Sequence, residues 1–205
     1  MNFSLIKFKS LKNLLLKIRA SALLLTVAYS VLSLIIIYRF YTQGLFDVFS
    51  IIVIGISLYF LFNYIVVRNN KYCLVKYRFS DEELNEIEDD IRNSQLYSSR
   101  IALSQNYLYS LQSQFFLLYR IPIDDIIWAY FIYTEKNQSR KPYVCIATRE
   151  KIYKLALTRD VGAVALNLVR LASDEDFLEQ LSALNNKILI GNTPENRERY
   201  QNKEF

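Results

Sequence analysis

Few residues in this chain are suited to catalysis. It contains no histidine, which excludes Ser-His-Asp triads, histidine-ligated metals and proton transfer by histidine. Its two cysteines, Cys73 and Cys145, are too few for a four-thiolate zinc site and lack a histidine base. Asp124-Asp125 is the most suggestive acidic pair. Adjacent residues of a strand point to opposite faces, so we interpret this pair as a turn that leads into a strand. We expect a protein that is not an enzyme and uses no cofactor.

The composition also argues against nucleotide or nucleic-acid binding. The four glycines are not clustered, so no glycine-rich phosphate-binding loop is predicted. The net charge of +5 equals the charge of residues 1–19, and the rest of the chain is balanced. Nucleic-acid binding needs a basic surface beside aromatic residues, so we expect no nucleic-acid partner.

Two uncharged apolar stretches predict a transmembrane helical hairpin over residues 20–67. The stretches are Ala20–Tyr38 and Val48–Val67. At about 1.5 Å of rise per residue, each is long enough to cross a hydrocarbon core of roughly 30 Å. The alternative is a pair of buried helices in a soluble protein, but the residues after Val67 could hardly cover two helices that are apolar on all sides.

The charges that flank the hairpin predict its orientation. Residues 1–19 are basic and contain no acid, and Arg68, Lys71, Lys76 and Arg78 follow the second stretch before the next acid. The positive-inside rule then places both termini in the cytoplasm. We expect a multi-pass protein of a bacterial plasma membrane, with membrane lipids as its neighbours.

Residues 1–19 form a basic amphipathic segment. Apolar residues recur at helical spacing at Phe8, Leu11, Leu15 and Ile18. Basic residues on the other side are Lys9, Lys12 and Lys17. Two interpretations remain open: a helix lying on the anionic inner leaflet, or a signal that sets the topology and has no further role.

A linker and an acidic helix are predicted over residues 68–95. Ser80 and Glu83 have the spacing of a capping box, and acids crowd the first turns that follow. Leu84, Ile87 and Ile91 form a narrow apolar stripe. We interpret the charged remainder as a solvated face.

The rest of the chain predicts a small antiparallel sheet followed by helices, and thus an α+β membrane protein. The predicted strands are Arg100–Ser104, Tyr107–Gln112, Phe115–Ile121, Ile126–Thr134, Tyr143–Thr148 and Lys151–Leu157. Glu135–Pro142 is predicted as a loop. Asp160 is predicted to cap a helix over Val161–Ala172, and Asp174 to cap a second helix that ends at about Leu184. Residues 193–205 are predicted as a polar surface tail with a helix start at Pro194. Consecutive antiparallel strands with a closing helix favour a curved sheet or an open barrel.

Several segments carry a resemblance to a known family. The run IPIDDIIWAYFIYT, the hairpin YVCIATREKIYKLAL and the closing helix resemble a bacterial pleckstrin-homology-like domain over residues 96–172. The layout with two N-terminal spans, and the tail KILIGNTPENRERYQNK within residues 173–205, are similar to uncharacterised bacterial membrane proteins with such a domain. Phosphoinositide-binding members of the fold use basic residues around the first hairpin, whereas SQNY and QSQF here contain none. The resemblance implies a fold and supplies no functional residues.

Basic residues are the candidate contacts for lipid or for a partner. The amphipathic segment contributes Lys9, Lys12 and Lys17, and the predicted loop contributes Lys136, Arg140 and Lys141. We expect the hairpin to anchor a domain that binds another protein or another copy of itself. The alternative is a sensor of anionic lipid or envelope stress at the inner leaflet.

Overall fold

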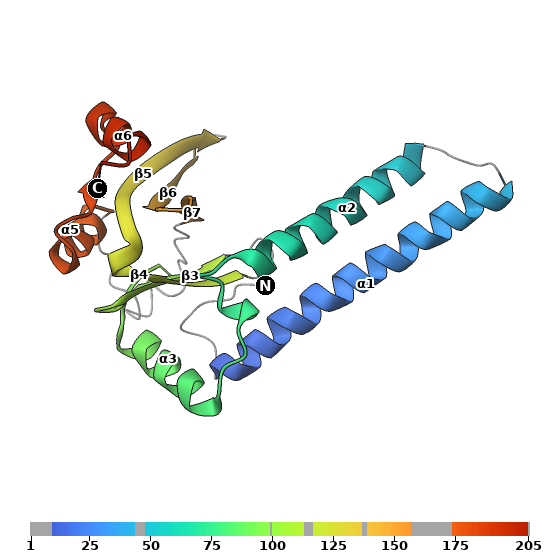
Figure 1. Cartoon of the computed structure of the whole chain (residues 1–205), viewed down its shortest axis with the longest axis horizontal. Coiled ribbons are helices and arrows are strands. Elements are labelled where there is room, and N and C mark those ends of the chain that lie inside the picture. The colour runs from blue at the N-terminus through green and yellow to red at the C-terminus, as the bar shows by residue number, and fades with distance from the viewer. Residues whose placement is uncertain are drawn as a thin grey trace.

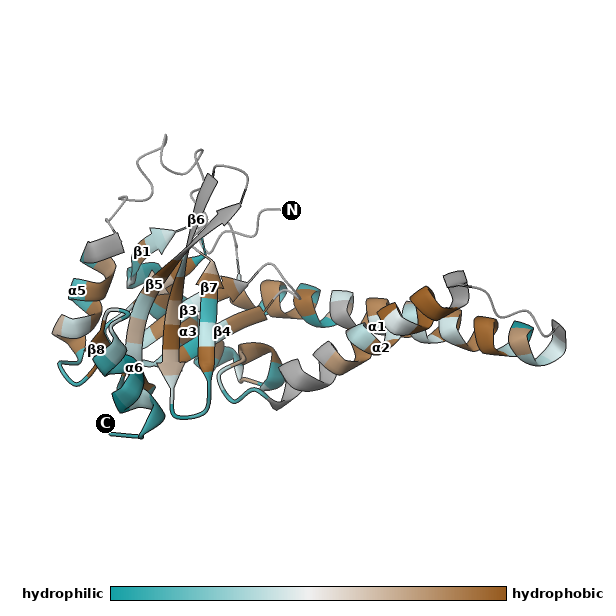
Figure 2. Ribbon diagram, turned by 90° about the horizontal axis from the view of Figure 1, so that it is seen from above, coloured by the Kyte–Doolittle hydropathy of each residue, from teal (hydrophilic) through white to brown (hydrophobic). Residues whose placement is uncertain are grey.

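The computed structural model describes residues 10–43, 48–98, 100–112, 117–136, 139–156 and 174–204. The chain is an α+β protein in which a long apolar N-terminal helix precedes small antiparallel sheets (Figure 1). Figure 2 shows apolar residues along most of the two N-terminal helices and a strongly polar C-terminal helix.

The first two helices form an antiparallel pair that extends away from the sheets (Figure 1). They are α1 (Leu11–Gln43) and α2 (Val48–Asn69). The Ser33 hydroxyl donates to the Ser57 hydroxyl at 2.7 Å across this pair, so small residues meet at the interface. Within the described residues, the helix Leu11–Thr42 is long and apolar enough to cross a membrane.

Helix α1 begins earlier than the apolar stretch, and its first turns belong to the domain core. Leu11, Leu14, Leu15 and Ile18 are all at most 5% exposed. They pack with α3 (Asp81–Asn93) and with strands of the first sheet. The apolar stripe of residues 1–19 is therefore covered by protein from Leu11 onward, an arrangement that neither sequence interpretation anticipated. An apolar stripe has the same spacing whether lipid or protein covers it.

The strands form two four-stranded sheets, whereas the sequence predicted one. The first sheet has the order β1-β2-β3-β4 and is antiparallel throughout. Its strands are Gln95–Ser98, Ile101–Leu103, Tyr107–Gln112 and Leu117–Pro122.

The second sheet has the order β7-β6-β5-β8. In chain order its strands are β5 (Ile126–Lys136), β6 (Ser139–Thr148), β7 (Ile152–Ala156) and β8 (Leu189–Ile190). The short strand β8 pairs in parallel with β5. The predicted loop 135–142 is wrong in part, because β5 and β6 continue as a paired ribbon to Lys136 and Ser139.

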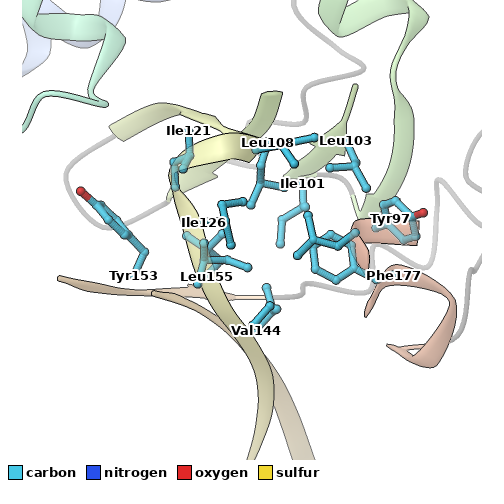
Figure 3. Packing of buried hydrophobic residues seen from close by; sticks show 14 of the residues in the cluster. Tyr97, Ile101, Leu103, Leu108, Ile121, Ile126, Val144, Tyr153, Leu155 and Phe177 are labelled. Carbon is cyan, nitrogen blue, oxygen red and sulfur yellow. The ribbon is translucent and has the colours of Figure 1, made fainter. Parts of the chain in front are cut away.

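The main hydrophobic core lies between the two sheets (Figure 3). The first sheet contributes Ile101, Leu108 and Ile121, each 0% exposed. Phe177 of α5 (Asp174–Leu184) closes one end of this core, where its ring meets that of Tyr97 edge-on at 4.9 Å. The bounds of α5 match the sequence prediction; the predicted helix 160–172 lies outside the described residues.

Helix α3 covers the other face of the first sheet. Its capping box is present, with the Ser80 side chain accepting from the backbone N–H of Glu83. The predicted stripe of Leu84, Ile87 and Ile91 is buried. Asp90 accepts hydrogen bonds from Tyr109 and Ser104, which ties the polar side of the helix to the sheet.

Helix α6 (Pro194–Gln201) packs against the outer face of the second sheet. The Trp128 indole N–H donates to the carbonyl oxygen of Gly191 at 2.7 Å, and the Tyr200 hydroxyl donates to that of Thr148 at 2.9 Å. The predicted polar tail is thus a docked helix. The Asn196 amide also donates to the carbonyl oxygens of Ile190 and Gly191, at 2.8 Å and 3.2 Å.

Candidate functional site

The chain that leaves α2 is built into the domain at the edges of both sheets. The backbone N–H of Arg120 donates to the carbonyl oxygen of Tyr72 at 2.9 Å, and Cys73 forms a β-bridge with Tyr119. The side-chain oxygen of Asn70 accepts from the Tyr72 backbone N–H at 3.0 Å and from the Tyr153 hydroxyl at 3.1 Å. We call Asn70, Tyr72, Tyr119 and Tyr153 the junction cluster. It joins α2 to β4 and β7.

The predicted acidic pair borders the junction cluster but does not converge on one site. Asp124 and Asp125 lie in a short 3-10 turn, Ile123–Asp125, that leads into β5, as the sequence predicted. Asp124 is exposed, whereas Asp125 accepts from the Tyr72 hydroxyl at 2.8 Å. Lys71 lies 3.7 Å from Asp125 and 3.1 Å from Glu150, so these charges compensate one another.

The tyrosines of the junction cluster act as neutral hydrogen-bond donors. Burial raises the pKa of Tyr119 to about 12 and also raises the pKa of Tyr153 and Tyr72. Hydrogen bonds to Tyr72 and Glu150 raise the pKa of Lys71. None of these pKa values is shifted toward pH 7, where a general acid or base works best. The cluster therefore joins the end of α2 to both sheets through neutral hydroxyl groups.

The start of α1 is fixed to the domain by polar contacts as well. The backbone N–H of Leu11 donates to the Glu88 carboxylate at 2.9 Å, so a residue of α3 caps the first turn of α1. Lys12 forms an ion pair of 2.7 Å with Asp81. The Arg19 guanidinium donates to the carbonyl oxygens of Val75 and Tyr77. The hairpin is attached to the domain at both of its ends.

The structure distributes the predicted contact residues over separate places. Lys9 lies outside the described residues. Lys12 is paired with α3, and Lys17 is exposed. Lys136, Arg140 and Lys141 lie on the β5–β6 ribbon, opposite Ser139, Glu135 and Thr134 in the strand register. Figure 1 shows the far end of β5 well away from the start of α1.

An open cavity of about 270 Å³ lies where α1 meets α3. Its lining residues are Ser10, Lys12, Asp81, Leu84, Asn85 and Glu88. The charged groups are already used, because Lys12 pairs with Asp81 and Glu88 accepts from Leu11 and Arg92. The cavity thus presents no unpaired charge to a ligand.

Both cysteines are inert in this fold. Cys73 and Cys145 are each 0% exposed, and burial raises the pKa of both thiols, which disfavours the reactive thiolate. In the part of the chain that the structure describes, no group of three or more metal-ligating side chains is suited to hold an ion.

Comparison of the chain with protein-family models, with curated proteins and with solved structures finds no match.

Proposed function

We propose that this chain is a non-enzymatic membrane protein whose α1–α2 hairpin holds a pleckstrin-homology-like interaction domain at the cytoplasmic face of a bacterial plasma membrane. The domain binds another protein or a second copy of the chain. The observation that carries the proposal is the attachment of the hairpin to the domain at both ends, through the first turns of α1 and the junction cluster.

Exposed apolar side chains support a membrane setting for the hairpin. Leu24, Leu34 and Phe62 are 69%, 66% and 66% exposed, and other large apolar residues of α1 and α2 are exposed as well. Apolar surface in water is unfavourable by about 25 cal/mol per Å², so helices with this surface are stable when lipid covers them. Leu11 and Asn70 both contact the domain, which favours a hairpin with both of its ends on the domain side.

The order of elements supports the pleckstrin-homology-like assignment. Four antiparallel strands form one sheet, three more form most of the second, and both sheets pack on one core. Two of the segments that carry the resemblance in sequence correspond to the turn before β5 with β5 itself, and to the β6–β7 hairpin; the third, the closing helix, lies outside the described residues.

A rigid attachment gives the proposed interaction a defined geometry. A flexible tether only raises the local concentration of a domain. Here α1 runs without a break from the domain core into the apolar stretch. A continuous helix of this kind fixes which surfaces of the domain face the membrane, which suits docking to a partner in the same membrane.

Cysteine labelling tests the topology. The native cysteines are buried and supply a silent background. Thr42→Cys lies near the tip of the hairpin and Lys187→Cys lies on the domain, and both positions are exposed. We expect a membrane-impermeant maleimide to label Thr42→Cys in intact cells and Lys187→Cys only after lysis. Labelling of both in intact cells would refute the cytoplasmic placement.

Purification of the full-length protein in a mild detergent tests the interaction. We expect a second protein, or a second copy, at a fixed stoichiometry that persists at high salt, because apolar docking is little screened. Recovery of the monomer with anionic lipid alone contradicts this function.

A sensor of anionic lipid is the second candidate, and the β5–β6 ribbon favours it. Among the described residues, β7 pairs with residues 143–147 of β6, whereas residues 139–142 pair with β5. Lys136, Arg140 and Lys141 lie on this ribbon. If charge sensing is the function, membrane association of the domain weakens steeply with salt and with alanine at these three positions.

A further inference from the structure

Three exposed cations lie near the base of the hairpin on segments that are distant in sequence. Lys17 lies on α1, and Lys76 and Arg78 lie on the turn that includes η1 (Leu74–Lys76). All three side chains are exposed. No ion pair within the described residues engages them, whereas Lys12, Lys71 and Arg92 are paired with acids.

Hydrogen bonds of Arg19 fix the position of this turn along the axis of α1. Its guanidinium donates to the carbonyl oxygens of Val75, at 3.1 Å, and Tyr77. The turn therefore lies beside α1 at the last charged residue before the apolar stretch that begins at Ala20. Lys17 is two residues earlier, or about 3 Å lower along the helix axis.

Tyr77 belongs to the same turn, and its hydroxyl donates to the backbone carbonyl oxygen of Lys71 at 2.7 Å. Tyr77 is 38% exposed, and the Lys76 ammonium lies 5.5 Å from the centre of its ring. Tyrosines are enriched at the headgroup level of membranes, where the ring meets the lipid and the hydroxyl meets water. Long basic side chains at this level extend toward the phosphates.

We propose that Lys17, Lys76 and Arg78 form a basic collar that binds the phosphodiester headgroups of anionic phospholipids. The proposal rests on the membrane insertion of the hairpin. Arg78 supplies a planar fork that matches two phosphate oxygens, and the two lysines supply point charges. The collar differs from the contacts predicted from sequence, because Lys12 is paired with Asp81 and the collar includes two residues of the turn after α2.

Native mass spectrometry of the full-length protein in detergent tests the collar. The protein is titrated with phosphatidylglycerol or with phosphatidylcholine, and the affinities are compared. The test variant is Lys17→Ala/Lys76→Ala/Arg78→Ala. The matched control, Lys154→Ala/Lys187→Ala/Arg199→Ala, removes the same charges from exposed positions elsewhere on the domain.

We expect the wild type and the control to bind phosphatidylglycerol more tightly than phosphatidylcholine. The collar variant loses most of this preference, up to about a hundredfold if each cation contributes roughly fivefold. Equal binding by the collar variant and the wild type would overturn the collar, and so would an equal loss in the control. Alkaline extraction of membranes separates the two proposals: a wild type released by carbonate refutes the membrane insertion, whereas a retained wild type with an unchanged collar variant refutes the collar alone.

Discussion

Replacing Leu15 with alanine is expected to destabilise the β-sheet domain, although Leu15 belongs to the helix that carries the apolar stretch. Leu15 is 3% exposed and lies in the core shared with α3 and the first sheet. Truncation of a buried leucine removes its transfer free energy and leaves a cavity, with a total cost of about 2–4 kcal/mol. The neighbouring Leu16 is 52% exposed, so Leu16→Ala is a matched control with an expected change below about 0.5 kcal/mol.

Guanidinium unfolding of the full-length protein in detergent measures this difference. Trp128, the only tryptophan, is 2% exposed in the second sheet and reports unfolding of the domain by fluorescence. With a slope of roughly 3 kcal/mol per M, a loss of 3 kcal/mol lowers the midpoint by about 1 M. If Leu15→Ala and Leu16→Ala unfold at the same denaturant concentration, the first turns of α1 are not part of the domain core.

The other predictions concern the junction cluster and α6. Asn70→Ala leaves two donors without their acceptor and is expected to cost about 2 kcal/mol in the same unfolding assay, whereas the exposed Asn93→Ala changes little. The pKa of Tyr119 rises from about 10 in the unfolded chain to about 12 in the fold. The unfolded chain therefore loses its proton first, and about 3 kcal/mol of stability present below pH 10 is lost as the pH rises toward 12. In Tyr119→Phe, the free energy of unfolding falls less steeply between pH 10 and 12. An unchanged dependence on pH contradicts the raised pKa of Tyr119. Tyr200→Phe removes the bond to the Thr148 carbonyl and costs about 1 kcal/mol, with unchanged Trp128 emission. Tyr200→Ala shifts that emission to the red, because loss of the Tyr200 ring, 5.6 Å from the Trp128 ring, exposes the indole to water.

Elements defined by local signals could be predicted from the sequence. The capping box of Ser80 and Glu83 located α3, and β3 and α5 have the predicted bounds. In each case the signal lies within the element itself, as a cap, an alternation or an apolar spacing.

Elements defined by a distant partner could not be predicted. Strand β8 has two residues and exists because β5 offers an edge. Strand β1 follows α3 directly and has no alternation long enough to recognise. Residues 135–136 and 139–142 have a polar sequence, so their cross-strand pairing is what makes them strand residues.

The same limit applies to the candidate site. Lys76 and Arg78 served in the sequence only as charges that orient the second span. Their place beside α1 depends on the bonds from Arg19 to the turn. Conversely, the sequence predicted Lys12 as a lipid or partner contact, whereas in the structure Lys12 forms an ion pair with Asp81. Periodicity gives the face of a helix on which a cation lies, but not the acid or carbonyl that meets it.

The contacts of α1 bear on how the domain folds. Leu11 and Leu118 belong to the core between α3 and the first sheet. They are the first and the last buried residues of that core along the chain, and more than half of the sequence separates them. Loop closure over such a distance is slow and must follow synthesis of β4. In the proposed topology, the apolar stretches enter the membrane before β4 exists, which brings the two ends of the hairpin together. Insertion then shortens the loop that folding still has to close to the segment between Asn70 and Leu118. The hairpin is in this sense a structural part of the domain, and a fragment that begins after α2 lacks one wall of the core.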